Sequence, residues 1–164
     1  MVLKQHQYTS KMDLKMLNQV QVRAAKIEDI NSIASLLAQM GYPQDLSILE
    51  PKIKRLIEDG NEVLLVAHIQ NQVCAFISMH YVPQLAVEGD YARISYFCVD
   101  EKFRSLKIGK ILLSHVEQLA QARRCDRVEL RSADYRKVAH RFYLANDYLD
   151  SPKFFIKKFN YSDD

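Results

Sequence analysis

A cluster of basic residues and one glycine directly precedes an apolar helical pattern in the stretch FRSLKIGKILLSH, residues 103–115. Arg104, Lys107 and Lys110 supply positive charge, and Gly109 is one of only four glycines in the chain. The first amides of a helix have no acceptor within the helix and can bind an anion, so this turn predicts a phosphate-binding site. The alternative is a basic helix start that is merely solvated, because short glycine turns often match by chance.

Two small residues would shape this turn. Ser105 stands where its hydroxyl can cap the first free amides of the helix. Gly109 lies on the first helical turn, where a missing Cβ lets another group approach the backbone closely. Apolar residues at helical spacing predict the buried face of this helix: Ile108, Ile111, Leu112, Val116 and Leu119.

A second group with chemical potential lies in RKVAHRFYLANDY, residues 136–148. The pattern predicts a helix with Val138, Ala139, Phe142 and Tyr143 on one face. A phenol can donate a proton to a leaving group within hydrogen-bond reach. The alternative is that Tyr143 is a core aromatic whose hydroxyl bonds to a neighbour.

These two segments need a scaffold, and the hydrophobic periodicity predicts one. Strands are expected at residues 19–24, 62–69, 73–81, 91–99, 127–132 and 153–159. Helices are expected at 26–41, after Pro43, from near Leu106, and at 134–147. The resulting order β-α-α-β-β-β-α-β-α-β predicts an α/β (α+β) domain, one mixed sheet with helices on its faces.

The bulk properties are those of an ordinary globular chain. The 164 residues fit one domain, with 48% hydrophobic and 26% charged residues. The net charge of +3 does not suggest a nucleic-acid binder. Three widely spaced cysteines form no metal or disulfide pattern, so we expect no metal and a reducing, cytoplasmic location.

The ends of the chain stand apart from this domain. No segment is apolar enough for a signal peptide or a membrane span, so we expect no membrane association. We assign residues 1–18 to an N-terminal extension of uncertain order, residues 19–160 to the domain, and residues 161–164 to a tail.

The turn at residues 99–113 resembles the GNAT superfamily of N-acetyltransferases. The signature of that family is Gln or Arg, two residues, Gly, one residue, and Gly or Ala, directly after the fourth strand. Arg104 and Gly109 match its two ends. Lys107 occupies the place of the first motif glycine, where it offers a backbone amide in helical geometry and a side chain that can crowd or pair with phosphates.

The C-terminal helix carries the second part of the resemblance. Ala139, Phe142 and Tyr143 match the alanine and the Phe-Tyr pair of the family pattern. Asp147 and Tyr148 replace its usual Gly-Phe, and Arg136 replaces its common asparagine. The two parts stand in the expected order and separation, and the whole resemblance covers residues 19–159.

The resemblance implies a GNAT-like, mostly antiparallel central sheet flanked by helices on both faces. It implies acetyl-CoA as co-substrate and an amine as acceptor, with Tyr143 as the acid that protonates the departing thiolate. The expected cofactor contacts are Phe97, Cys98, Val99, Arg104, Ser105, Leu106, Lys107, Ile108, Gly109, Lys110 and Arg136. The acceptor should dock against the two N-terminal helices and the loop QLAVEGD, in which Glu88 and Asp90 can attract a cation.

The general base stays open at this stage. Many members of the family carry a glutamate where this chain has Ser95. His80 is an alternative base, because imidazole titrates in the useful range, or else an ordinary half-exposed histidine at a strand end. We interpret Glu129 as a structural hydrogen-bond acceptor rather than a base. The spacing of His115 and His140 does not indicate a metal site.

Two other function classes compete with an N-acetyltransferase. A non-catalytic acyl-CoA-binding or regulatory module would fit the departures at Lys107, Ser95 and Arg136. A nucleic-acid binder would use Arg123, Arg124, Arg127 and Arg131, but no aromatic stacking platform accompanies them. The acceptor amine and the oligomeric state stay undetermined, although the strand at 153–159 can serve as the pairing edge of a homodimer.

Overall fold

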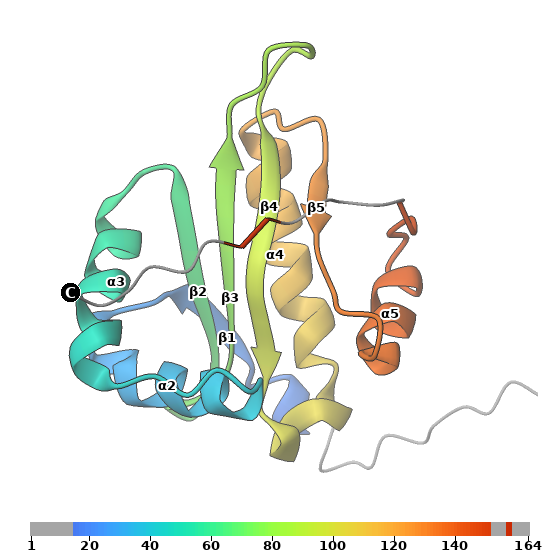
Figure 1. Ribbon diagram of the computed structural model, residues 1–164. Coiled ribbons are helices and arrows are strands. Elements are labelled where there is room, and N and C mark those ends of the chain that lie inside the picture. The colour runs from blue at the N-terminus through green and yellow to red at the C-terminus, as the bar shows by residue number, and fades with distance from the viewer. Residues whose placement is uncertain (1–14, 152–156, 159–164) are drawn as a thin grey trace, which may run out of the picture. The chain divides into compact units, whose positions relative to one another are not determined.

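The central element of the protein is a five-stranded sheet whose strands follow one another in chain order (Figure 1). This computed structural model describes residues 15–151 and 157–158. The strands are β1 (Gln21–Ala24), β2 (Glu62–Ile69), β3 (Gln72–Val82), β4 (Tyr91–Val99) and β5 (Val128–Leu130). The first four pair antiparallel and β5 pairs parallel to β4, which confirms the predicted mixed, mostly antiparallel sheet.

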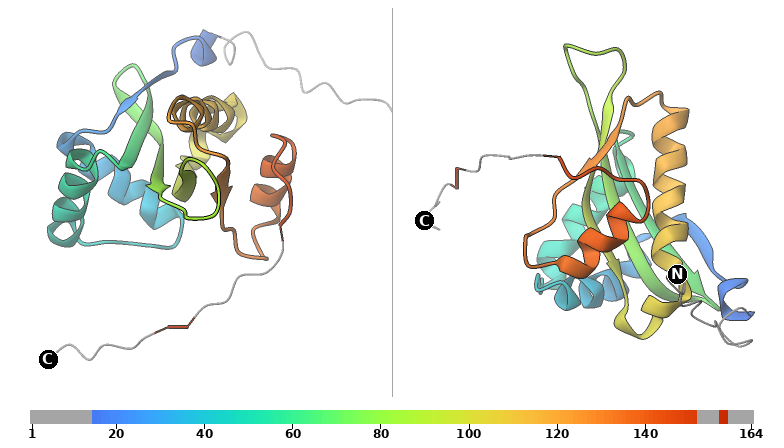
Figure 2. Two further views of the ribbon diagram at one scale, coloured as in Figure 1. Left: turned by 90° about the horizontal axis from the view of Figure 1, so that it is seen from above. Right: turned by 90° about the vertical axis from the view of Figure 1, so that its right-hand side faces the viewer.

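Helices cover both faces of this sheet, as expected. The helical segments are η1 (Ile27–Asp29), α2 (Ile30–Gln39), α3 (Leu46–Glu58), η2 (Glu101–Leu106), α4 (Ile108–Ala122) and α5 (Lys137–Leu144). Helices α2 and α3 pack on one face and α4 on the other (Figure 2). The chain divides into two compact units, of which the first ends at Arg131 and the second begins at Ser132. Helix α5 belongs to the second unit.

The face under α2 and α3 holds the hydrophobic core that anchors the sheet. Ile33, Leu36, Leu49 and Ile53 bury their side chains from the helices, and Phe76 is the largest side chain that the sheet contributes. The apolar residues recur at three- and four-residue spacing, so one stripe of each helix is removed from water. Pro51 lies inside α3 on its exposed side.

Helix α4 packs its own stripe against the opposite face of the sheet. Ile108, Leu112, Leu113 and Val116 are 0–1% exposed. The predicted stripe was therefore largely correct, but Leu119 is 39% exposed and does not belong to it. This packing fixes the direction of α4 and thereby the place of its N-terminus, the predicted anion site.

The turns that join these elements follow local backbone rules. Gln70 and Asn71 both have positive φ, as a two-residue hairpin between β2 and β3 requires. Gly41 has φ +89° just after α2, the left-handed conformation that often ends a helix. Asp45 caps α3 by accepting the amide of Ser47 at 2.8 Å.

Two expectations, on membrane-spanning helices and on the ends of the chain, can be compared only with the residues that the structure describes. None of the helices in the described ranges has the length and apolar character needed to cross a bilayer. The strand predicted at 153–159, with its dimer edge, lies outside the described residues except for Lys157 and Lys158. Most of the predicted N-terminal extension and the tail also lie outside them.

Candidate active site

The turn between β4 and α4 is the structural centre of the predicted anion site. Asp100 opens η2 by accepting the amide of Lys102 at 2.9 Å. The short helix then ends at Lys107, whose φ of +54° and ψ of +16° are left-handed. Helix α4 begins at the next residue, and its first backbone bond runs from the amide of Ile111 to the carbonyl of Lys107 at 3.3 Å. The amides of residues 108–110 therefore form the open first turn of a 15-residue helix.

The backbone conformation of Lys107 explains why a glycine would suit this position. Left-handed backbone is strained for residues with a Cβ and easy for glycine. The expectation that Lys107 offers its amide in helical geometry was wrong, because the residue forms the hinge between two helices rather than a turn of either. Gly109, by contrast, lies inside the first turn of α4 and is half-buried.

The start of α4 is displaced from the residue that we expected to cap it. Ser105 lies within η2, and the N-cap position of α4 belongs to Lys107, two residues later. The short helix η2 was missed because its residues fill a charged turn without apolar periodicity. The side chain of Lys107 makes no capping hydrogen bond to α4.

Basic side chains surround this helix start. The Nε of Arg104 donates to the carbonyl oxygen of Val99 at 3.3 Å, which folds the side chain back across the end of β4. Lys107 and Lys110 are exposed and line a hollow along α4, together with Ile111 and Ser114. Positive side chains next to open helix amides fit a diphosphate, so the residues present suit the acetyl-CoA expected for the site.

Other predicted contact residues reach the site only through their backbone. Leu106 and Ile108 are 4% and 0% exposed, because their side chains belong to the core. The side chain of Cys98 is buried on the α2 and α3 face. Ile108 is buried together with its main chain, so Gly109 and Lys110 are the residues of this helix start that a ligand can reach.

One edge of β4 is turned away from the other strands. The amide of Asp100 donates to the carbonyl of Cys74 on β3 at 2.9 Å. Amides alternate in direction along an antiparallel strand, so those of Val99 and Phe97 point away from β3. The pairing of β4 with β5 covers only residues 92–94 and 128–130. Beyond Ile94, β5 no longer pairs with that edge of β4.

A β-bulge marks the point where the pairing with β5 ends. Ser78 pairs with Tyr96 and Met79 with Ile94, which leaves Ser95 as the extra residue of β4. Ser95 and Tyr96 are both exposed in the middle of a strand whose other residues are buried or half-buried. Tyr96 contacts Tyr42, with ring centroids 5.8 Å apart and perpendicular planes. The bulge thus presents exposed polar and aromatic groups beside α2.

Tyr143 and Arg136 belong to the second unit. Tyr143 lies on α5 between the rings of Phe142 and Tyr148, with centroids 5.3 and 5.6 Å away. Burial raises the pKa of Tyr143 to about 12, so the hydroxyl is protonated throughout the neutral range. Arg136 is the N-cap residue of α5, and Val138 is 73% exposed rather than on the packed face.

A histidine–carboxylate pair lies on the sheet, and sequence reasoning found only half of it. His80 Nδ1 hydrogen-bonds to Glu62 Oε2 across the β2–β3 register. Their side chains are 27% and 18% exposed. Glu62 was missed because it lies 18 residues from His80 and only the hairpin register brings them together.

Glu129 is the structural acceptor that we expected. It accepts Arg93 Nε at 2.9 Å and Arg127 Nε at 3.1 Å, across the short β4–β5 pairing and along β5. Burial raises the pKa of its carboxyl, but the hydrogen bonds from Arg93 and Arg127 outweigh that effect and lower the pKa overall.

Several further charged residues form structural contacts with one another. Asp90, one of the two loop carboxylates, lies 3.5 Å from Arg123, which also donates to Asn61 at 2.6 Å. Arg127 forms an ion pair with Asp126 at 2.9 Å. Two of the four arginines proposed for nucleic acid therefore face carboxylates, and the structure gives that alternative no support.

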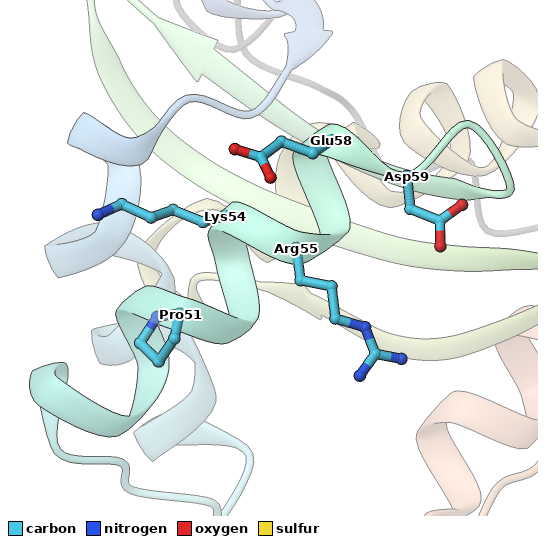
Figure 3. Close-up of a pocket in the computed structure, with 5 residues that line it drawn as sticks. All are labelled: Pro51, Lys54, Arg55, Glu58 and Asp59. Carbon is cyan, nitrogen blue, oxygen red and sulfur yellow. The ribbon is translucent and has the colours of Figure 1, made fainter.

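Two further features lie outside the turn. A hollow on α3 is lined by Pro51, Lys54, Arg55, Glu58 and Asp59 (Figure 3). All five side chains come from one helix and its end, so this hollow lacks the opposing wall that a binding site needs. Within residues 15–151 and 157–158, no three His, Cys, Asp or Glu side chains come together as metal ligands.

Comparison with known proteins agrees with this geometry. The model of the acetyltransferase (GNAT) family matches residues 27–148. No curated protein matches the sequence at a significant level. The chain belongs to the GNAT acetyltransferase family, whose members generally use acetyl-CoA.

Solved structures share the fold at low sequence identity. A transcriptional regulator from Bacillus halodurans C-125 is 21% identical, with a TM-score of 0.78 over 85% of this chain and 99% of that one. A GNAT family acetyltransferase from Staphylococcus aureus is 22% identical, with a TM-score of 0.74 over 86% and 99%. A ribosomal-protein-alanine N-acetyltransferase from Brucella melitensis is 17% identical, with a TM-score of 0.71 over 85% and 99%.

Proposed function

We propose that the protein is an acetyl-CoA-dependent N-acetyltransferase that moves the acetyl group to a primary amine of a small molecule or protein. The observation that carries the proposal is the left-handed turn at Lys107, which ends η2 and starts α4 without a capping hydrogen bond from its own side chain, next to the exposed Lys107 and Lys110. The same strand that leads into this turn presents an edge that does not pair with β3.

Binding would begin at the helix start. The diphosphate of acetyl-CoA would accept hydrogen bonds from the amides of Gly109 and Lys110 at the start of α4, with the side chains of Lys107, Lys110 and Arg104 balancing its charge. The pantetheine arm would run along β4, where the amide of Val99 faces away from β3. An amide at this edge would also polarise the thioester carbonyl, as an oxyanion-hole donor does.

The chemistry would then be direct attack on the thioester. The neutral amine forms a C–N bond to the carbonyl carbon, the C–S bond breaks, and the sulfur leaves as a thiolate. Tyr143 would give its proton to that thiolate as the acceptor nitrogen returns one, because burial keeps the phenol protonated but, with a pKa of about 12, too weak an acid to transfer the proton alone. The acceptor nitrogen gives up one proton to restore the phenol, and positioning of the reactants supplies much of the acceleration.

Thermal unfolding with and without acetyl-CoA tests the binding step. Ligand at about 100 times its dissociation constant should stabilise the protein by about 2.7 kcal/mol. Pantetheine, which lacks the diphosphate, is the matched control and should stabilise far less. Equal stabilisation by both compounds, or by neither, would contradict the proposed grip of α4 on the diphosphate.

Thiol release tests the transfer step. Acetyl-CoA should yield free thiol only when an acceptor is added, and the panel is spermidine, lysine, kanamycin, tyramine and a peptide with an N-terminal alanine. Amine-dependent release and a mass gain of one acetyl group on the amine establish the enzyme.

A non-catalytic acyl-CoA-binding module is the second candidate. It is favoured by Ser95, an exposed bulge residue where a carboxylate is common in the family. Stabilisation by acetyl-CoA without release for any amine of the panel would establish this module instead.

Three broader expectations remain proposals. We propose the domain boundaries 19–160, of which the family match spans 27–148. We propose a cytoplasmic location, which is consistent with Cys74, a buried thiol whose pKa burial raises to about 11. We also propose that a homodimer can form through the strand predicted at 153–159.

A further inference from the structure

The pair of Glu62 and His80 has no role in the packing of the core, yet it is held in a defined geometry. Glu62 begins β2, and His80 lies opposite it near the end of β3. An unpaired carboxylate next to an apolar core is costly, so a partner for Glu62 has a structural use. A lysine or arginine would serve that use equally well, and the imidazole differs from both because its second ring nitrogen can accept a proton.

The sheet register places His80 close to the bulge of β4. His80 is opposite Arg93, and Ser95 follows Arg93 by two residues on the same strand. Adjacent strands are about 4.8 Å apart and residues rise about 3.4 Å each, so the Cα atoms of His80 and Ser95 are roughly 8 Å apart. His80 also shares a face with Ser78, which pairs directly with Tyr96.

That face is the one on which the exposed bulge groups lie. Phe76 points into the core under α2 and α3, and side chains alternate along β3, so His80 points to the same side. Tyr96 also lies on this side, because it contacts Tyr42 from the loop after α2. The imidazole is 27% exposed, so a bound molecule over the bulge can reach it.

The hydrogen bond to Glu62 decides which nitrogen can act. Glu62 is bonded to Nδ1, and a carboxylate at that atom favours the tautomer with the proton on Nδ1. In that tautomer Nε2 carries the lone pair and can accept a proton. A carboxylate also stabilises the imidazolium that forms after proton transfer, as in other histidine–carboxylate pairs.

From this geometry we propose that His80 is the general base of the acetyl transfer, with Glu62 as its positioning residue. The proposal rests on the proposed function. An ammonium acceptor would give one proton to Nε2 of His80, and the neutral amine would then attack the thioester carbonyl. The C–S bond breaks, the thiolate takes its proton from Tyr143, and the nitrogen returns a second proton to that phenol. His80 releases its proton to water, so the charges and atoms balance.

The charged groups that face His80 from neighbouring strands are Glu62 on β2 and Arg93 on β4. Arg93 is itself held by Glu129, with its Nε 2.9 Å from that carboxylate. The imidazole therefore lies between a carboxylate that is bonded to it and a guanidinium that is bonded elsewhere.

The decisive variant is His80→Gln, which can still donate a hydrogen bond to Glu62 but cannot take a proton. His68→Gln is the matched control, because His68 lies on β2 outside the site. Thermal unfolding of each variant with and without acetyl-CoA shows whether it folds and binds. Thiol release is then measured from pH 6 to 9 with the five-amine panel and with hydroxylamine, which is largely neutral at pH 7.

If His80 is the base, His80→Gln lowers kcat for the alkylammonium acceptors by a hundredfold or more near pH 7 and removes the acidic limb of the pH profile. Its acetyl-CoA stabilisation stays at the wild-type value, and the loss is smaller with hydroxylamine. Glu62→Gln should lower kcat by a smaller factor and shift the acidic limb. The control variant His68→Gln should show neither loss of kcat.

The outcomes separate this proposal from the function on which it rests. If the wild type releases thiol and folded His80→Gln has the same kcat and the same pH profile, the assignment of His80 as the base is overturned. The proposed N-acetyltransferase function is then unaffected. If His80→Gln does not fold, His80→Asn and the pH profile of Glu62→Gln decide, and unchanged profiles again overturn it. Absence of release in the wild type overturns the proposed function itself, and the base assignment with it.

Discussion

Tyr143 is the residue whose chemistry depends most on its surroundings. Its ring is packed between Phe142 and Tyr148, and burial raises its pKa to about 12. A phenol in this state stays protonated at neutral pH, and its raised pKa makes it a weaker acid than an exposed tyrosine. The hydroxyl can therefore hydrogen-bond to the departing thiolate, and it can give up its proton only as the acceptor nitrogen returns one.

We expect Tyr143→Phe to lower kcat by about a hundredfold or more, because a positioned acid contributes that order of acceleration. The affinity for acetyl-CoA should change by less than about threefold, since the ring and its packing remain. Single-turnover thiol release and calorimetric binding measure the two quantities separately. Tyr135→Phe is the control, because Tyr135 is 77% exposed in the same unit. Unchanged turnover in Tyr143→Phe would make Tyr143 a packing residue.

Lys107 combines backbone strain with charge, and two substitutions separate these effects. Lys107→Gly relieves the left-handed backbone and should raise the free energy of unfolding by about 1 kcal/mol. Lys107→Met keeps the strain and removes only the charge. Both should weaken coenzyme A binding by about threefold to tenfold, and the loss should shrink at high salt because it is electrostatic. Urea unfolding and calorimetry at two salt concentrations check these effects.

Tighter rather than weaker binding of coenzyme A by a Lys107 variant would indicate a different role for the lysine side chain. If Lys107→Gly binds coenzyme A more tightly than the wild type, the lysine side chain crowds the phosphates rather than pairing with them. The family preference for glycine would then reflect space around the ligand as well as backbone conformation.

At the scale of the elements, the contact between β4 and β5 is short and is reinforced by one ion pair. Three residue pairs join these strands, and Arg93 and Glu129 connect the same positions through their side chains. The parallel pairing stops just before the bulge at Ser95.

We expect Glu129→Gln to speed hydrogen exchange in β5 while leaving β2 and β3 unchanged, because only the β4–β5 contact loses its ion pair. The lowered pKa of Glu129 means that its stabilisation is present above about pH 4.3 and is lost as the pH falls through the folded-state value. The stability of the wild type should therefore fall more steeply below pH 4 than that of Glu129→Gln. Glu58→Gln on the exposed side of α3 is the matched control.

Sequence patterns were sufficient for the long helices and strands and insufficient for the short helix η2 and the junctions. The predicted strands at 62–69 and 73–81 and the stripe of α4 followed from hydrophobic periodicity. The hinge at Lys107 was missed because a lysine gives no sign of left-handed backbone. The bulge at Ser95 and the pair of Glu62 and His80 depend on strand register, which arises from tertiary packing.

On the scale of the whole molecule, the proposed machinery is divided between two compact units. The first contains the sheet, the anion site and His80, and the second contains Tyr143 and Arg136. The net charge of +3 is small for 164 residues, so local rather than overall charge would attract the phosphates.

Hydrogen exchange with and without coenzyme A tests the participation of both units. We expect slower exchange at the amides of Gly109 and Lys110, because the diphosphate would accept hydrogen bonds from them, and also along α5. Exchange in β1, at the far edge of the sheet, should not change and serves as an internal reference. Protection confined to the first unit would place Tyr143 outside the cofactor site.

The bulge at Ser95 divides β4 into two halves whose side chains are out of phase. Without this extra residue, Tyr96 and Cys98 would follow Arg93 by two and four positions, so regular alternation would leave both on the side where the register already places them. Only the side chain of Ser95 itself would be lost, and the layers under α2, α3 and α4 would keep their members. Alignments of related chains should therefore tolerate a one-residue gap at this point of the strand, and a gap at any neighbouring position should be read as shifted to it.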